Sequence, residues 1–189
     1  MEKFQFKHII LGAGQPFAGN LHTSVRSINK NLNVLDWLLR IFSNVSYKTI
    51  FVSGYQSEEI SLKYPRLEFK YNTEWVSTGP GWSLYLALGN SSTECLVTYS
   101  DILFREDVVQ QVSETPGDVV VAIDKNWKKR FIPRTLEDLE SREKAYFKGD
   151  SILKLGSKLP IKTSTAEFLG FVKLSARALK ELKKIKVNE

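Results

Sequence analysis

The sequence has a single cysteine and only two histidines among its 189 residues. Cys95 cannot form a disulfide within the chain, and it stands in the apolar stretch ECLVTYSD, so we interpret it as a small buried hydrophobic side chain. His8 and His22 do not complete a metal-binding cluster with it. A disulfide scaffold and a histidine-based metal centre are therefore both excluded.

Long apolar runs are also missing from the sequence. No segment is long enough to cross a bilayer, and the polar start MEKFQFKH is not typical of a secretion signal. Together with the scarcity of cysteine, these absences predict a cytoplasmic protein that does not act at a membrane.

Acidic residues are outnumbered, since 27 lysines and arginines face 21 aspartates and glutamates and give a net charge of +6. Such a charge suits nucleic acid or phosphate-bearing small molecules as partners. Much of the excess lies in KNWKKR and in LKELKKIK, and the spacing of the second stretch predicts a helix with a solvated lysine face. No nucleic-acid-binding signature accompanies the charge, so nucleic acid is not the expected partner.

Short apolar runs alternate along the chain with stretches of helical spacing. This alternation predicts an α/β protein of the Rossmann-like kind, with three layers and a mostly parallel sheet covered by helices on both faces. The expected strands are residues 8–12, 48–54, 67–72, 94–101, 118–124, 151–156 and 166–174, and the expected helices are 34–42, 56–64, 81–88, 105–114, 135–147 and 175–185. In such sheets ligands bind beyond the carboxyl ends of the strands.

The stretch HIILGAGQPFAG places three glycines directly after the first expected strand. Glycines at such a position let backbone N–H groups approach an anionic ligand without a clash from side chains. The alternative is a tight turn that binds nothing. The spacing matches neither the dinucleotide fingerprint G-x-G-x-x-G nor the phosphate loop that ends in G-K-[ST].

Nearly the whole chain resembles nucleotidyltransferases of the sugar-phosphate and phosphocholine type. The first part carries, in the family's order, IILGAG, FVSGYQSEEI, YNTEWVSTGPGWSLYLAL and CLVTYSDILF. The later part carries VVVAIDKNW, EKAYF, LGSKL and AEFLGFVKLS, which resemble the acceptor half of cytidylyltransferases for choline phosphate and phosphonates. The resemblance implies one domain over residues 1–189, with a nucleotide-binding half at about 1–115 and an acceptor half at about 116–189.

The resemblance also implies which residues bind the nucleotide. Asp101, at the end of an expected strand, would bind Mg²⁺, for which one or two carboxylates suffice; its alternative is a turn or helix-capping aspartate. Trp82 would either pack on the core or stack on a ligand. The backbone of Leu11, Gly12, Ala13, Gly14 and Gln15 would hold the nucleotide, and Thr78, Gly79 and Ser83 would form the opposite wall.

The acceptor half supplies four further candidates by the same resemblance. Lys144 and Lys158 would pair with the acceptor phosphate, or else be ordinary solvated lysines. Asp124 matches a further family element. Glu167 would bind an amine of the acceptor, because a carboxylate without a positive partner is costly within an apolar strand.

The chain departs from the family pattern at three points. The arginine of the glycine loop is absent, and the family's P-K dipeptide falls on Thr23–Ser24, so Arg26 or Lys30 would have to face the departing phosphates. His22 lies in the same loop and could also contact phosphate. No late acidic residue offers itself as a second metal ligand, which raises the prospect that the chain is part of a longer protein.

These residues predict a Mg²⁺-dependent nucleotidyltransferase that uses a nucleoside triphosphate, with CTP favoured, and a small phosphorylated or phosphonate acceptor. The alternative is a degenerate nucleotide- or metabolite-binding domain on the same fold, and the altered loop favours that alternative. A basic nucleic-acid-binding module is a third reading, which rests on charge alone. The oligomeric state is not predicted.

Overall fold

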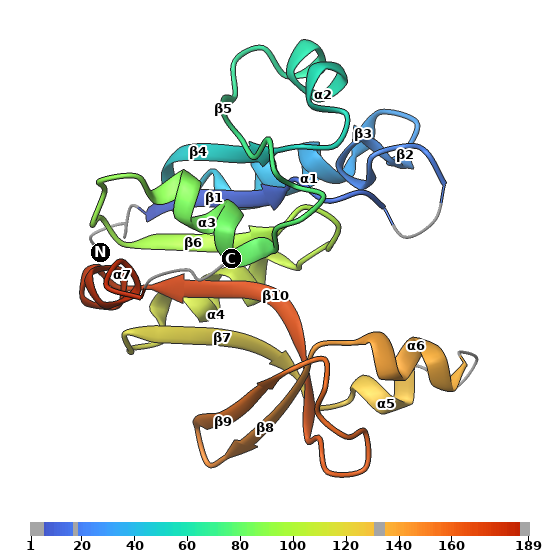
Figure 1. Cartoon of the computed structure of the whole chain (residues 1–189), viewed down its shortest axis with the longest axis vertical. Coiled ribbons are helices and arrows are strands. Elements are labelled where there is room, and N and C mark those ends of the chain that lie inside the picture. Colours follow the sequence, from blue (N-terminus) through green and yellow to red (C-terminus); the bar gives the residue numbers. More distant parts are fainter. Residues whose placement is uncertain (1–5, 17–18, 131–134, 186–189) are drawn as a thin grey trace. The chain divides into compact units, whose positions relative to one another are not determined.

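The computed structural model describes residues 6–16, 19–130 and 135–185 (Figure 1). Its strands are β1 (Phe6–Gly12), β2 (Ser27–Asn29), β3 (Leu32–Asn33), β4 (Ser46–Ser53), β5 (Glu68–Tyr71), β6 (Cys95–Tyr99), β7 (Val119–Asp124), β8 (Lys144–Lys148), β9 (Ser151–Gly156) and β10 (Ala166–Leu174). Its helices are α1 (Val34–Phe42), α2 (Ser57–Lys63), α3 (Pro80–Leu88), α4 (Glu106–Glu114), α5 (Trp127–Arg130), α6 (Leu136–Ser141) and α7 (Ala176–Leu182), with a short 3₁₀ turn, η1 (Thr23–Val25).

The described residues form two compact units. The larger unit contains the residues up to Val120 and those from Val172 onward, and the smaller unit contains Val121–Phe171. Strands β7 and β10 each run from one unit into the other. In the described part of the chain, no helix is long and apolar enough to cross a membrane.

The larger unit is built on a parallel sheet in the order β5-β4-β1-β6. The central strand β1 pairs with both neighbours, so that Ile9 lies opposite Ile50 of β4 and Val97 of β6. Strand β10 follows β6 in the sheet order. The mostly parallel α/β fold expected from the sequence is therefore confirmed.

Helices cover the sheet of the larger unit because successive side chains of each strand point to opposite faces. On one face Ile9, Val97 and Leu174 of the strands pack with Leu88 of α3 and Leu179 of α7. The single cysteine, Cys95, belongs to this core, is buried, and has its pKa raised to about 12 by burial. The expectation that Cys95 is a buried hydrophobic residue is confirmed.

The opposite face is covered by α1, whose start after Asn33 agrees with the sequence. The Asn33 backbone N–H donates to the Asp36 carboxylate at 2.8 Å, which closes the first turn of the helix. Leu35, Leu38 and Phe42 of α1 are fully buried. Their spacing of three and four residues places them on the face of the helix that contacts the sheet.

His8 of β1 is part of this second core. Its ring is fully buried, stacks on Phe42 with 3.9 Å between ring centroids, and lies 2.9 Å from the Thr98 hydroxyl through Nε2. Burial lowers the pKa of His8 to about 3. The imidazole is therefore neutral in the fold, and His8 serves as a packing residue of this core.

Stability should consequently fall with acidity. His8 takes up a proton near pH 6.5 in the unfolded chain but only near pH 3 in the folded chain. Its contribution to the free energy of unfolding is therefore fully present above about pH 6.5 and is lost as the pH drops below that value. We expect a loss of about 1.4 kcal/mol per pH unit from His8 alone. Urea unfolding of the wild type and of His8→Gln between pH 7 and 4 checks this, because the carboxylates and His22 are common to both proteins. Equal pH slopes for the two proteins would refute it.

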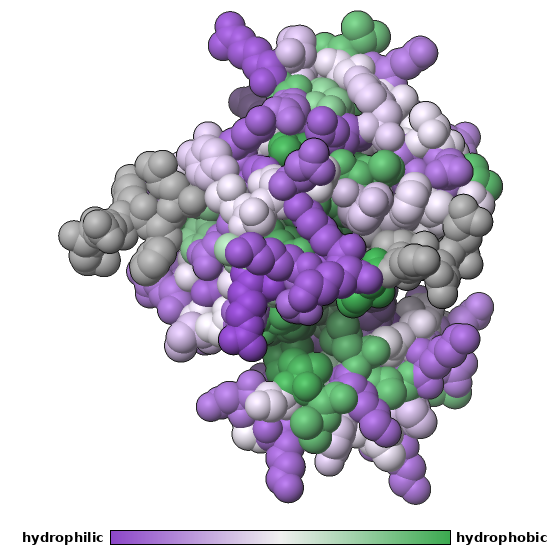
Figure 2. All heavy atoms as spheres, turned by 60° about the vertical axis from the view of Figure 1, so that its left-hand side comes forward, coloured by the Kyte–Doolittle hydropathy of each residue, from purple (hydrophilic) through white to green (hydrophobic). Residues whose placement is uncertain are grey.

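The smaller unit contains an antiparallel hairpin, β8–β9, and the first part of β10, which pairs with β8. Trp127 of α5 is its largest buried side chain and is 1% exposed. Apolar side chains also remain on the surface of the hairpin, where Tyr146, Leu153 and Leu155 are exposed. Figure 2 shows hydrophobic residues gathered in the lower part of the face that it presents.

The helix expected over residues 135–147 is wrong in its second half. Helix α6 ends at Ser141, Arg142 has an extended backbone, and Lys144–Lys148 form strand β8. Residues of this stretch are good helix formers in isolation, but Lys144 pairs with Glu167 of β10 and Ala145 with Leu155 of β9, and these tertiary contacts override the local preference. The short elements β2, β3 and α5 gave no sequence pattern strong enough to predict them.

Candidate nucleotide site

Four chain segments follow the parallel strands of the larger unit and meet at the carboxyl edge of its sheet. The Ser100 N–H, after β6, donates to the Leu11 carbonyl at 3.1 Å. The Tyr55 N–H, after β4, donates to the Ala13 carbonyl at 2.9 Å, and the Asn72 N–H, after β5, donates to the Ser53 carbonyl at 2.8 Å. The predicted nucleotide loop is therefore held from both sides by the neighbouring strand ends.

The physical reason for glycine differs among the glycine positions at this edge of the sheet. A Cβ on Gly12 would lie 2.2 Å from the ring of buried Phe51, so packing alone requires glycine there. At Gly14, Gly79 and Gly81, apart from chain neighbours and local helix backbone, no atom of the described residues lies within 4 Å of the point where a Cβ would be, and none of the three has a positive φ. Neither packing among the described residues nor backbone conformation demands glycine at these three positions, which is compatible with close approach of another molecule and with an open turn.

The remaining members of the predicted loop differ in exposure. Leu11 is half-buried and Ala13 is buried, whereas Gly14 and Gln15 are exposed. Gly54 lies against this loop, since a Cβ there would be 2.6 Å from the Ala13 carbonyl oxygen. The exposed part of the loop that a ligand could reach is therefore its turn at residues 14 and 15.

His22 fastens the chain that follows the loop. Its Nε2 lies 2.8 Å from the Gly12 carbonyl, which can only accept, so Nε2 carries the proton and Nδ1 accepts from the Ser24 hydroxyl at 2.7 Å. The His22 N–H donates to the Gln56 side chain, whose amide donates to the Asn20 carbonyl. Burial lowers the pKa of His22, opposed by the Gly12 carbonyl and the charge of Asp101.

The expectation that His22 could contact phosphate is therefore wrong. The side chain is 1% exposed, and both ring nitrogens have partners within the chain. Ser24, where the family has the lysine of its P-K dipeptide, is fully buried. Arg26 is half-buried with a guanidinium nitrogen 3.8 Å from the Cβ position of Gly19, and Lys30 is exposed between β2 and β3. Arg26 and Lys30 remain the basic candidates of this loop.

The predicted opposite wall is organised by a residue that the sequence reasoning did not select. Asn72 is buried, and its side-chain NH₂ donates to the Thr78 and Ser83 hydroxyls, each at 3.0 Å. Thr78 in turn donates to the Glu74 carbonyl at 2.8 Å. Gly79 is exposed and precedes α3. Asn72 could have been selected from its place in the stretch YNTEWVSTGPGWSLYLAL, which carries the family resemblance.

Two aromatic residues of α3 lie next to this wall. The rings of Trp82 and Tyr85 stack with 5.3 Å between their centroids and 16° between their planes. Trp82 is half-buried and Tyr85 is exposed. Trp82 therefore packs against an exposed ring of its own helix, and its two interpretations, packing on the core or stacking on a ligand, stay predictions.

Asp101 lies two residues beyond β6 and is exposed, beside Ser100 that bonds the glycine loop. No group of three or more histidine, cysteine or acidic side chains able to hold a metal occurs among the described residues. A single exposed carboxylate nevertheless suits Mg²⁺, which accepts few protein ligands and fills its remaining positions with water and ligand phosphates. Asp101 is therefore compatible with a magnesium ion that arrives with a triphosphate.

In the smaller unit, Asp124 ends β7 and accepts a hydrogen bond from the Asn126 N–H at 2.8 Å, which makes a tight turn. Lys158 is exposed in the segment after β9. Lys144 and Glu167, by contrast, are buried. Of the four predicted acceptor residues, Lys144 and Glu167 are brought together as cross-strand neighbours on β8 and β10.

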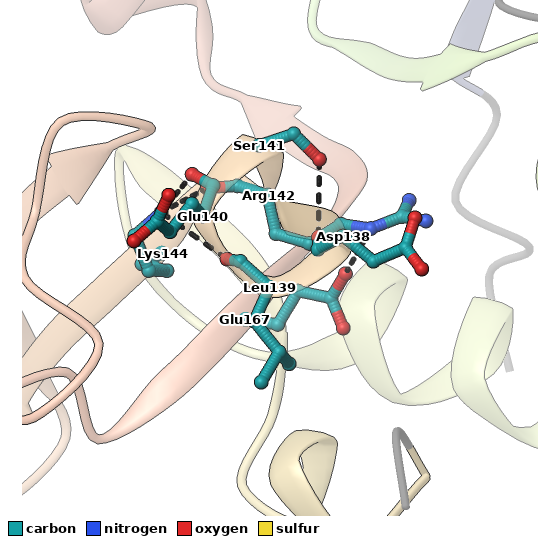
Figure 3. A network of polar contacts seen from close by, with 7 residues as sticks. All are labelled: Asp138, Leu139, Glu140, Ser141, Arg142, Lys144 and Glu167. Carbon is teal, nitrogen blue, oxygen red and sulfur yellow. Dashed lines mark hydrogen bonds and ion pairs between the residues drawn. The ribbon is translucent and has the colours of Figure 1, made fainter. Parts of the chain in front are cut away.

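Figure 3 shows how these two buried charges are satisfied. The Lys144 ammonium donates to the carbonyls of Glu140 at 2.6 Å and Arg142 at 2.8 Å, and reaches that of Leu139 at 3.5 Å, so it caps the end of α6. Burial lowers the Lys144 pKa. Arg142 Nε forms an ion pair with Glu167 at 3.9 Å. The partner that Glu167 requires is thus supplied by this chain.

Removing the Lys144 ammonium should destabilise the protein strongly. Lys144→Met keeps the aliphatic stem but leaves the main-chain carbonyls at the end of α6 without their charged donor, and we expect a loss of about 3 kcal/mol in unfolding free energy. The matched control is Lys148→Met, on the same strand but exposed, which should change stability by less than about 0.5 kcal/mol. Urea unfolding measures both, and equal stability of the two variants would contradict the capping role.

No family model matches the sequence. Over 164 residues the chain is 23% identical to the CTP:phosphoglutamine cytidylyltransferase of Campylobacter jejuni, and the match covers 81% of this chain and 65% of that protein. The chain thus spans slightly less than two thirds of this curated relative.

Solved structures show the same fold. The inositol-1-phosphate CTP transferase of T. maritima superposes with a TM-score of 0.71 at 15% identity, covering 98% of this chain and 76% of that one. A putative glucose-1-phosphate thymidylyltransferase from Bacillus anthracis gives 0.70 at 14% identity, covering 96% and 76%. The CTP:phosphocholine cytidylyltransferase of Streptococcus pneumoniae gives 0.62 at 17% identity, covering 95% and 75%. The resemblance to cytidylyltransferase-like nucleotidyltransferases is confirmed.

Proposed function

We propose that this chain, similar in sequence and fold to cytidylyltransferases, transfers a nucleotidyl group from a nucleoside triphosphate to a small phosphorylated or phosphonate acceptor and releases pyrophosphate. The observation that carries the proposal is the set of Gly14, Gly79 and Gly81, at which neither packing nor backbone conformation requires glycine. CTP is favoured as the donor because the named relatives include a CTP:phosphoglutamine, a CTP:phosphocholine and an inositol-1-phosphate CTP enzyme.

The proposed reaction is an in-line displacement at the α-phosphorus of the nucleotide. An oxygen of the acceptor forms a bond to that phosphorus while the bond to the pyrophosphate oxygen breaks. Backbone groups of residues 11–15 would hold the phosphates, and Arg26 and Lys30 would offset their charge. Asp101 would hold Mg²⁺, which when bound neutralises part of the charge that repels two anionic reactants.

The acceptor is proposed to be bound by the smaller unit. Asp124, Lys158 and Glu167 are its candidate contacts, and Lys144 is assigned to holding the main chain beside Arg142. An acceptor that carries an amine would share the Glu167 carboxylate with Arg142, whose Nε is 3.9 Å away. Acceptors with and without an amine should therefore be compared directly.

The test is to incubate the purified chain with each of the four nucleoside triphosphates, Mg²⁺ and a panel of phosphorylated and phosphonate acceptors, and to measure pyrophosphate. Release that requires both CTP and an acceptor supports the proposal. Absence of release with every combination contradicts it.

A second candidate is a nucleotide-binding domain without turnover. The observation that favours it is Ser24, which is fully buried where the family has its phosphate-facing lysine. Saturable binding of a nucleotide in calorimetry, without pyrophosphate release, would support this candidate.

A further inference from the structure

The contacts of the Asn72 side chain determine which way its amide group points. Its Oδ1 accepts from the Glu74 backbone N–H at 3.0 Å, and that N–H can only donate. The Nδ2 group must therefore face the Thr78 and Ser83 hydroxyls, to each of which it donates at 3.0 Å. Asn72 is 1% exposed, so water does not compete for these bonds.

This orientation fixes the direction of the hydrogen bonds that the two hydroxyls can make. Both oxygens receive a hydrogen from Asn72, which leaves each hydroxyl with its own hydrogen to donate. Thr78 donates that hydrogen to the Glu74 carbonyl at 2.8 Å. For Ser83 no acceptor of this hydrogen occurs within residues 6–16, 19–130 and 135–185. Ser83, which is 3% exposed, thus keeps one hydrogen to donate in the first turn of α3, next to Gly79 and Gly81.

We propose that Asn72 is a positioning residue that keeps the Ser83 hydroxyl as a hydrogen-bond donor to the nucleotide, and that the base bound here presents an acceptor to Ser83. The inference rests on the proposed nucleotide site. Asn72 itself does not touch the ligand and acts through Ser83. Its backbone bond to Ser53 and its side-chain bonds join the end of β5, residues 73–79 and the first turn of α3.

Asn72→Asp tests the direction of these bonds while it preserves their shape. A carboxylate can only accept, so it draws the hydrogens of Thr78 and Ser83 toward itself and reverses the donor that faces the nucleotide. We expect the dissociation constant for CTP to rise about ten-fold or more. The exposed Asn90→Asp carries the same chemical change away from this wall and should leave CTP affinity unchanged.

A double-mutant cycle separates positioning through Ser83 from general loss of structure. Ser83→Ala should weaken CTP binding to a similar degree, and adding Asn72→Asp to Ser83→Ala should cost little more. Additive losses would overturn the inference, as would unchanged CTP affinity in Asn72→Asp. Urea unfolding of each variant reports whether it is folded.

The same calorimetry distinguishes this inference from the proposed function. If the wild type binds no nucleotide, the proposed site fails and takes the inference with it. If the wild type binds CTP but the cycle is additive, the site stands and the role of Asn72 fails.

Discussion

Asp101→Asn should lower the rate of pyrophosphate release on the order of a thousand-fold, which corresponds to about 4 kcal/mol of lost transition-state stabilisation. The substitution keeps the shape of the side chain and removes only its charge. Asp101 is exposed, so the fold should tolerate the change. Steady-state rates at saturating CTP and acceptor measure the effect.

Calorimetry gives a second readout for Asp101 that does not depend on turnover. Mg²⁺ should strengthen CTP binding to the wild type and have little effect on Asp101→Asn. Asp107→Asn is the matched control, because Asp107 is also exposed in the larger unit but pairs with Arg105 at the start of α4. Equal rates and equal magnesium dependence in Asp101→Asn and the wild type would remove Asp101 from the site.

Gly12→Ala should destabilise the protein by about 3 kcal/mol, because the new methyl group overlaps the Phe51 ring at 2.2 Å. The backbone of β1 cannot move away easily, since it is paired with β4 on one side and β6 on the other. Urea unfolding measures the loss. Phe51→Leu added to Gly12→Ala should restore part of the stability, and failure of this rescue would locate the strain elsewhere.

Gly14→Ala is the comparison for Gly12→Ala, and it should lower CTP affinity without lowering stability. Space is open at this position and its φ is not positive, so stability should stay the same or rise by about 0.5 kcal/mol through the loss of freedom in the unfolded chain. CTP affinity should fall about ten-fold if the backbone approaches phosphate there. Unchanged affinity would mean that residue 14 is only an exposed turn.

The contrast between these two glycines shows what the sequence could and could not provide. The pattern of apolar residues was enough to predict each of the expected strands and the parallel sheet, because the burial of a strand can be inferred from its own residues. The reasons for the glycines are not local. Gly12 faces a ring from the neighbouring strand, whereas Gly14 faces open space, and one sequence motif covers both.

The predictions that failed for single residues have the same explanation, because each depends on a partner that is distant in the sequence. His22 sits in a polar loop and was expected at a phosphate, but its partner is a carbonyl ten residues earlier in the chain. Glu167 was correctly expected to need a positive partner, yet nothing in the sequence indicated that Arg142 would provide it. Lys144 lies in a stretch with helical propensity, and only its pairing with β10 makes it a strand residue.

The buried thiol of Cys95 makes this chain convenient for spectroscopic work. With its pKa raised to about 12, it carries almost no thiolate at neutral pH and should resist maleimide reagents. A second cysteine placed at exposed Gln15 would then react alone. A fluorophore there would test whether a nucleotide arrives at the proposed site, without removal of the native sulfur.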